Sequence, residues 1–133
     1  LYRRLAPATG SLGTVTWTVN TKTNLTVLAY SGAADVPTLS VSAAKTGATS
    51  TSFTAPAVTV VDPGSAVISF WAVRASATTT WTPAAGTTER ADSTGSGSGQ
   101  MGASAADQLG VGAGPVAART AVASLSSAKG EDS

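Results

Sequence analysis

The feature that most constrains this chain is the run at residues 66–75, which is apolar at nearly every position. Read with the alternation of a β-strand, it places Val67 and Trp71 on one side and Ile68 and Phe70 on the other. A strand that is apolar on both sides is usually central in a sheet and covered on both faces, as in a sandwich. The sequence therefore predicts a buried central strand.

A tight turn precedes this strand at Asp62-Pro63-Gly64. Proline presets φ for one turn position, and glycine tolerates the positive φ of a later one. Another β-like apolar segment lies directly before the turn. We therefore predict that residues 53–74 form a β-hairpin.

The remaining strands are inferred from alternation and turn spacing. They are predicted at residues 1–6, 14–19, 25–30, 39–44, 87–91, 100–108 and 115–125. The small residues of 100–108 fit a helix as well as a strand, and the neighbouring strands favour β-structure there. The polar residues 20–24 suit a hairpin connection between the second and third of these. No segment joins a helix-capping signal to an apolar stripe. About eight or nine short strands at this spacing predict an all-β, antiparallel sandwich of jelly-roll-like architecture.

Length and composition agree with one small domain. The chain has 133 residues, of which 11% are charged and 5% aromatic. Small, β-tolerant residues with few charges suit a thin all-β domain, often an extracellular one. We place this domain at residues 1–125, with a polar, frayed tail at 126–133 and a mobile Gly/Ser loop at 92–99.

Composition also argues against several functions. The chain has no cysteine and no histidine, which removes disulfides, thiol nucleophiles and histidine bases. Its net charge is +1 and its basic residues are scattered, so nucleic-acid binding is not expected. No apolar run approaches the roughly 20 residues of a membrane span, and membrane insertion is not expected either. With no recognisable nucleophile motif, we predict a protein that is not an enzyme and has no cofactor.

The acidic residues show no spacing that suggests a catalytic pair. All of them except Glu89, Asp107 included, are assigned to predicted turns or their neighbours. Glu89, Arg90 and Asp92 are expected to form a small polar cluster at a strand end. Asp35 and Asp92 are the weak candidates for calcium ligands, because sandwich loops often bind this ion through Asp side chains. Plain turn chemistry explains them more simply.

The tryptophans suggest a sugar-binding alternative, because aromatic faces stack on pyranose rings. Trp17 and Trp71 alternate with valines, so we assign both to the core. Trp81 lies among threonines just before Pro83, near predicted loops, where an exposed face could act as a platform supplemented by Tyr30. Packing of Trp81 in the core or at its rim is the simpler interpretation.

Several pieces of the chain, from about residue 1 to residue 130, resemble one family. They are LYRRLA, TVTWTV, LTVLAYSGAADVP, the TAP before AVTV, AVISFWAVRASATTTWTP, GTTERADS and AARTAVASLSSAKG. This pattern resembles a β-sandwich module of actinobacterial secreted proteins and of virion proteins, tail or surface, of their phages. The resemblance implies a non-enzymatic structural or adhesive module, located in the extracellular space or in a virion.

The resemblance also implies further strands. Members of that family carry several strands before the piece matching LYRRLA and one after the piece matching SSAKG. We therefore expect either a fragment or a chain completed by strand donation from other subunits, in a homo- or hetero-oligomeric assembly. Two alternatives remain: a carbohydrate-binding module with Trp81 as platform for a surface glycan, and, more weakly, a hydrolase domain that uses carboxylates.

Overall fold

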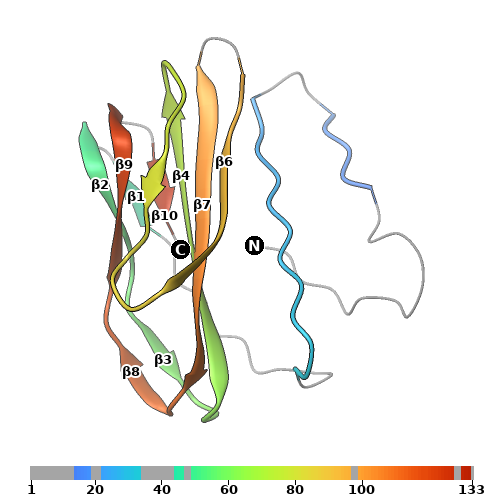
Figure 1. Cartoon of the computed structure of the whole chain (residues 1–133), viewed down its shortest axis with the longest axis vertical. Coiled ribbons are helices and arrows are strands. Elements are labelled where there is room, and N and C mark those ends of the chain that lie inside the picture. The colour runs from blue at the N-terminus through green and yellow to red at the C-terminus, as the bar shows by residue number, and fades with distance from the viewer. Residues whose placement is uncertain are drawn as a thin grey trace.

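The computed structural model describes residues 14–18, 22–33, 44–46, 49–96, 99–127 and 130–132. These residues form β-strands and no helix, and accordingly include no helix that could cross a membrane (Figure 1). The strands are β1 (Ala44–Thr46), β2 (Ser50–Ala55), β3 (Val58–Val60), β4 (Ser65–Ala75), β5 (Trp81–Thr82), β6 (Thr88–Thr94), β7 (Gln100–Val111), β8 (Gly114–Val116), β9 (Arg119–Ser127) and β10 (Gly130–Asp132). The predicted all-β, antiparallel sandwich is confirmed.

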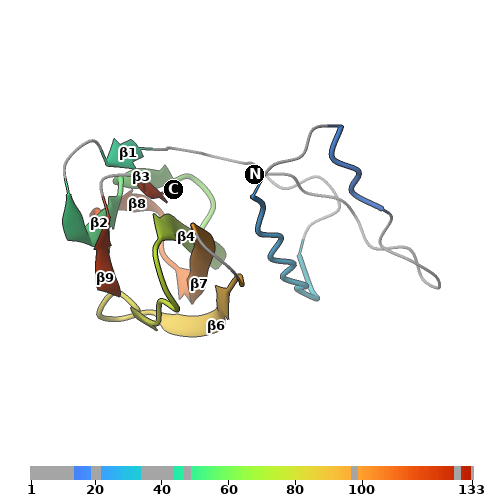
Figure 2. The same ribbon diagram turned by 90° about the horizontal axis from the view of Figure 1, so that it is seen from above.

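Two layers face each other across the core (Figure 2). One layer is a five-stranded sheet in the order β1-β10-β4-β7-β6, and the other is a three-stranded sheet in the order β2-β9-β5. The short pair β3-β8 lies at one end of the sandwich. The chain passes repeatedly from one sheet to another, as in a jelly roll.

The core contains few large side chains and many small ones. Phe53 of β2 and Trp81 of β5 pack edge to face, with ring centroids 5.5 Å apart. Trp71 and Val73 of β4 face them from the five-stranded sheet and are fully buried. Four alanines, from β2, β7 and β9, complete the cluster together with one from the loop after β5: Ala55, Ala106, Ala121, Ala123 and Ala84. Trp71, Phe53 and Val73 are the largest fully buried side chains, and the small alanines around them let the two layers approach closely.

Strand β4 occupies the central position predicted for residues 66–75. It pairs with β7 on one side and β10 on the other. Its inner face is buried, whereas the outer face is only partly covered: Ile68 is 42% exposed and Phe70 and Ala72 are half-buried. The expected complete burial of both faces is therefore found on one face only.

The turn at residues 62–64 forms as predicted, but the hairpin does not. Gly64 has a φ of 84°, the left-handed conformation that glycine tolerates. Strand β3, which precedes the turn, pairs with β8 instead of β4, with Val58 opposite Val116. The turn thus joins two sheets. Alternation identifies the faces of a strand but not its neighbour, and the hairpin prediction was wrong for that reason.

Two predicted strands near the N-terminus join no sheet among the described residues. We call residues 14–18 the arm and residues 22–31 the strap; both lie outside the strands of the sandwich. The predictions for residues 1–6 and 39–43 fall outside the described part of the chain. Strand β1 begins at Ala44, where the predicted strand at 39–44 ends.

The C-terminal half follows the prediction with shifted boundaries. Residues 100–108 form a strand as expected, β7, which continues to Val111. The predicted Gly/Ser loop begins later, because β6 extends to Thr94. The predicted strand at 115–125 is divided between β8 and β9. The predicted tail from residue 126 instead includes the end of β9 and all of β10, which inserts between β1 and β4.

Candidate functional site

The candidate site lies on the outer face of the five-stranded sheet, the face turned away from the core. Residues opposite each other in a ladder point to the same face. On β7, Ala103, Ala105 and Asp107 stand opposite the outward-facing residues of β4 and therefore share the outer face. All three are nonetheless buried, with at most 1% of their surface exposed. They must be covered by chain from outside the sandwich.

The strap provides this cover. Near its start, the Asn24 amide donates hydrogen bonds to Ser93 Oγ at 3.0 Å and to the Met101 carbonyl at 3.4 Å. Near its end, the Tyr30 hydroxyl donates to Asp107 Oδ2 at 2.7 Å. These two anchors make the strap run in the same direction as β7, across the outer face (Figure 1).

The strap keeps the alternation predicted for residues 25–30, although it forms no ladder. Asn24, Thr26 and Leu28 are half-buried and face the sheet. Leu25 and Val27 point away from it and are 61% and 59% exposed. The strap thus behaves as a strand with one covered face and one open face.

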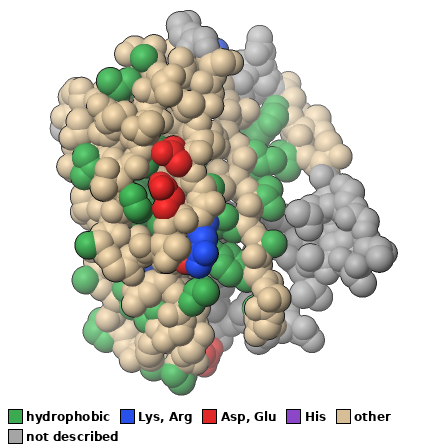
Figure 3. Space-filling model, viewed as in Figure 1, with side chains coloured by type: hydrophobic (Ala, Val, Ile, Leu, Met, Phe, Trp, Pro, Cys, Tyr) green, Lys and Arg blue, Asp and Glu red, His purple; other side chains and the backbone are tan. Residues whose placement is uncertain are grey.

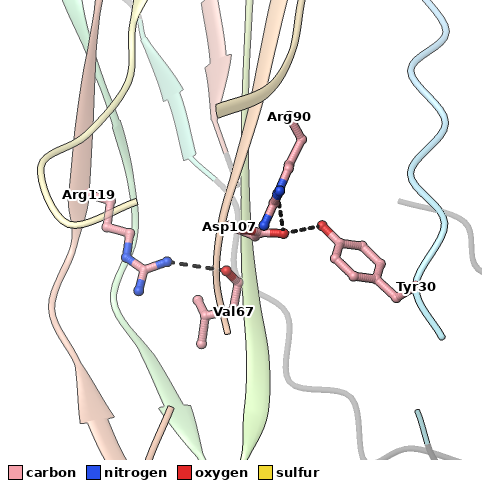
Figure 4. A network of polar contacts seen from close by, with 5 residues as sticks. All are labelled: Tyr30, Val67, Arg90, Asp107 and Arg119. Carbon is pink, nitrogen blue, oxygen red and sulfur yellow. Dashed lines mark hydrogen bonds and ion pairs between the residues drawn. The ribbon is translucent and has the colours of Figure 1, made fainter. Parts of the chain in front are cut away.

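Tyr30, Asp107 and Arg90 form the polar network that fixes the end of the strap (Figure 4). Arg90 of β6 donates from Nε to Asp107 Oδ2 at 2.9 Å, the same oxygen that accepts from Tyr30. The Asp107 side chain is buried, whereas that of Arg90 is 40% exposed. Asp107 Oδ1 is also buried and has no hydrogen-bond partner in the described part of the chain.

The network stabilises the charged carboxylate and the neutral phenol. The hydrogen bond from Arg90 lowers the pKa of Asp107, and with help from Tyr30 it outweighs the opposing effect of burial. Burial, followed by the contact with Asp107, raises the pKa of Tyr30 to about 12. The hydrogen bond to Asp107 also raises the pKa of Arg90. None of these shifts brings a group toward pH 7, so the network is suited to holding the strap and not to transferring protons.

A buried cation, Arg119 of β9, connects the two layers inside the sandwich (Figure 4). Its guanidinium donates to the Val67 carbonyl at 3.3 Å and to the Gln108 side-chain oxygen. Arg119 is only 9% exposed, and burial lowers its pKa. These contacts tie β9 to β4 and β7 and give Arg119 a structural role.

The predicted sugar platform is not assembled. Trp81 is 7% exposed and packs on Phe53 in the core, so it presents no open aromatic face. Tyr30 lies on the opposite side of the five-stranded sheet and engages Asp107. The half-exposed tryptophan is Trp17, at 53%, which the sequence assigned to the core. Alternation shows which residues share a side but not whether that side is covered.

The acidic residues that the sequence singled out are not brought together either. Asp92 accepts a hydrogen bond from the Trp81 backbone at 3.1 Å, while Asp35 lies outside the described residues. The expected cluster of Glu89, Arg90 and Asp92 does not form, because Glu89 accepts from Ser104 and Arg90 reaches Asp107. Within the described ranges, no three acidic side chains gather as a metal site would require.

Sequence reasoning missed Asp107 because it treated this residue only as a neighbour of the predicted turn that follows residue 108. The residue lies within β7, in the small-residue stretch GASAADQ. A single carboxylate in such a stretch, if the stretch is a buried strand, needs a cation or several donors from elsewhere in the chain. The need for such partners could have marked Asp107 as a candidate site residue in the sequence. It could not have identified Arg90 and Tyr30 as those partners.

Two pairs of large apolar side chains remain open to solvent, one on the arm and one on the strap. We call Val15 and Trp17 the arm pair; each is 53% exposed. We call Leu25 and Val27, on the outward side of the strap, the strap pair. Hydrophobic side chains can be seen along the strap in the space-filling view (Figure 3). Residues 14–18 and 23–33 contain no charged side chain.

No family model, no curated protein and no solved structure matches this chain. The resemblance described from the sequence thus remains a prediction, and the fold and the outer-face site stand on the residues themselves.

Proposed function

We propose that this chain is a non-enzymatic structural or adhesive β-sandwich module of a larger extracellular assembly. The proposed contact surface is the open side of the strap together with the arm. The observation that carries the proposal is the exposure of the arm pair and the strap pair, each side chain more than half open to solvent.

Physical chemistry favours contact at this surface. Single exposed apolar residues are ordinary, but large ones concentrated on one segment are typical of interaction sites. The centre of a protein interface is also depleted of charge. The arm, residues 14–18, and the part of the strap at residues 23–30 contain no charged side chain. Covering Leu25 and Val27 would remove apolar surface from water on both sides of the contact.

The preferred setting is a phage virion, in its tail or on its capsid surface. This part of the proposal rests on the resemblance of the quoted pieces to actinobacteriophage and actinobacterial surface modules. The low content of charged residues, 11%, is compatible with that setting. Two observations support a non-enzymatic role. The acidic residues Glu89, Asp92 and Asp107 each bind a separate partner, and the pKa shifts of the Tyr30–Asp107–Arg90 network lead away from pH 7.

A carbohydrate-binding role is the second candidate. One observation favours it: Trp17 is a half-exposed tryptophan, and its ring could stack on a sugar as Trp81 in the core could not. Under this alternative the chain would be monomeric, and a glycan array would give signals that disappear in Trp17→Ala.

The test of the structural proposal is the particle mass measured by light scattering after size exclusion, for the wild type and for Leu25→Thr/Val27→Thr. Threonine is compatible with an extended backbone at both positions, keeps the β-branched shape of Val27, and removes apolar surface. We expect the wild type to exceed the 13.0 kDa of one chain, and the double variant to fall toward it. Val122→Thr, at a 43% exposed position on β9, is the matched control and should behave as the wild type does. A wild type that stays monomeric at every concentration would refute the proposal.

A further inference from the structure

We infer that the strap is a releasable cover, which can leave the outer face of the five-stranded sheet while the sandwich stays folded. The contact that holds it closed is the network of Tyr30, Asp107 and Arg90. This inference concerns the covered side of the strap, whereas the proposed function concerns its open side. It therefore does not depend on what the open side binds.

The strap is attached to the sandwich through very few groups. In the described part of the chain, every hydrogen bond between the strap and the sandwich involves the side chain of Asn24 or of Tyr30. No backbone hydrogen bond joins the described strap residues to a strand. No residue from 22 to 33 is fully buried, and only Asn24, Thr26 and Leu28 are half-buried. The strap can therefore leave by breaking a small number of contacts.

The sandwich, in turn, does not depend on the strap for its core. Its buried apolar cluster comes from β2, β4, β5, β7, β9 and the loop after β5, and includes no strap residue. Strand β7, on which the strap lies, pairs with β4 on one side and with β6 on the other. Its ladders therefore remain when the strap leaves. Segments with few buried apolar contacts and no ladder open at a lower free energy than the whole fold.

The two anchors of the strap differ in strength. Asn24 bonds neutral groups, at 3.0 Å and 3.4 Å, whereas the Tyr30 hydroxyl donates to a carboxylate oxygen at 2.7 Å. Hydrogen bonds to charged groups are the stronger kind. Arg90 binds the same oxygen from β6, so the acceptor stays charged and in place whether or not the strap is present (Figure 4). The Tyr30 anchor thus controls release.

The closed position also has a cost that opening relieves. Beneath the strap, Ala103, Ala105 and Asp107 are at most 1% exposed. Asp107 Oδ1 is buried there with no hydrogen-bond partner in the described part of the chain. A buried, unpaired carboxylate oxygen is unfavourable, and water can bind it once the strap has left. Closed and open positions are therefore closer in free energy than folded and unfolded chain.

The test compares two neighbouring residues of β7 that are equally buried on opposite faces. Ala105, at 1% exposure, lies under the strap, and Ala106, at 0%, lies in the core. The natural chain has no cysteine, so Ala105→Cys and Ala106→Cys each introduce a single thiol, which reacts with a soluble thiol reagent only when its cover opens. We expect the thiol at position 105 to react at least roughly tenfold faster than that at position 106. Its rate should also depend little on low concentrations of denaturant, because strap release exposes little surface.

The role of the network is tested in the same two backgrounds. Tyr30→Phe removes the hydrogen bond to Asp107 and keeps the ring. It should raise the labelling rate at position 105 about tenfold or more and leave the rate at position 106 nearly unchanged. Ala103→Cys, under the strap, and Ala121→Cys, in the core on β9, form a second pair should a variant of the first pair fail to fold.

The outcomes decide both parts of the inference. Equal rates on the two faces, with equal denaturant dependence, would mean that the strap leaves only when the whole fold unfolds, and would overturn the inference. Faster labelling under the strap that Tyr30→Phe does not accelerate would overturn the role of the network. Either result is independent of the particle mass, which tests the proposed function separately.

Discussion

Asp107 occupies a position where a charged side chain is costly. It points out of the sandwich from β7, yet it is 1% exposed because the strap lies over it. An ionised carboxylate loses its hydration on burial, and here Arg90 and Tyr30 replace part of that hydration with two hydrogen bonds to one oxygen. The same two bonds connect β6, β7 and the strap, so a local electrostatic requirement fixes the path of a distant segment.

Replacing this carboxylate should weaken the fold. In Asp107→Asn the charge that pairs with Arg90 is lost while the shape is kept, and we expect the free energy of unfolding to fall by about 1–3 kcal/mol. Chemical denaturation measures the change. Asp62→Asn, in the exposed turn before β4, is the matched control and should change it little. Equal stability of the two variants would contradict the proposed role of Asp107.

Acid should have a related effect in the wild type. Since the folded-state pKa of Asp107 lies below its ordinary value of 3.8, its contribution to stability is present above about pH 4 and is lost as the pH falls through the folded pKa. The wild type should therefore lose more stability below pH 4 than Asp107→Asn does. Denaturation curves at pH 7 and pH 3 measure this difference. An equal loss of stability in the wild type and in Asp107→Asn would contradict a stabilising role for the ionised Asp107 carboxylate.

Tyr30 should be recognisable by its titration. Its pKa of about 12, against an ordinary 10.0, means that its contribution to stability is complete below pH 10 and is lost as the pH rises toward 12. Tyrosinate absorbance should show one of the chain's two tyrosines ionising near pH 12. The step near pH 12 should disappear in Tyr30→Phe. Two tyrosines that both titrate near pH 10 in the wild type would show that the strap is not held as described.

At the scale of elements, the alternation of apolar residues predicted well which side of a strand each residue occupies, but it predicted poorly which strands pair with each other. It placed Trp71 and Val73 on one side of a central strand, and both are fully buried. The same alternation was used to pair β3 with β4, although β3 pairs with β8 across more than fifty residues of chain. Pairing depends on the path of the whole chain, which period-2 patterns do not contain.

The strap illustrates the same limit. Its strand-like pattern is real, since one side faces the sheet and the other faces solvent. The sequence could not show that the neighbour would be a sheet face instead of another strand. Because the strap packs on a sheet face, one of its sides stays open and Leu25 and Val27 are exposed. The candidate site is therefore on the outer face of the sheet and not at Trp81, which is buried.

The packing of β7 against the loop before β5 can be tested with a glycine. A Cβ at Gly102 would lie 3.2 Å from Thr79 Cβ, with Trp81 Nε1 and Val73 Cγ1 within 3.7 Å. Thr79 is buried and has little room to move, so Gly102→Ala should lower the free energy of unfolding by about 1–2 kcal/mol. Gly112→Ala is the control, because nothing lies within 4 Å of its Cβ. Denaturation midpoints compare the two, and a Gly102→Ala as stable as Gly112→Ala would show a looser inner face.

For the whole molecule, the sandwich is complete enough to bury its aromatic core, while arm and strap leave their apolar pairs open. The core depends on a few rings and many alanines, and the outer face depends on one small polar network. Among the described residues, the interior of the sandwich is closed, and the arm pair and the strap pair are exposed to solvent. The proposed assembly would cover these two pairs.

The most direct test of this account is the accessibility of tryptophan to a soluble fluorescence quencher, measured over a range of protein concentrations. The chain has three tryptophans; Trp71 and Trp81 are buried, at 0% and 7% exposure, and only Trp17 is half open. The quenchable emission should therefore come from Trp17 and disappear in Trp17→Phe. We predict that this fraction falls as the concentration rises, because the arm becomes covered. A quenchable fraction that stays constant up to the highest concentration would contradict the claim that this surface is a site of assembly.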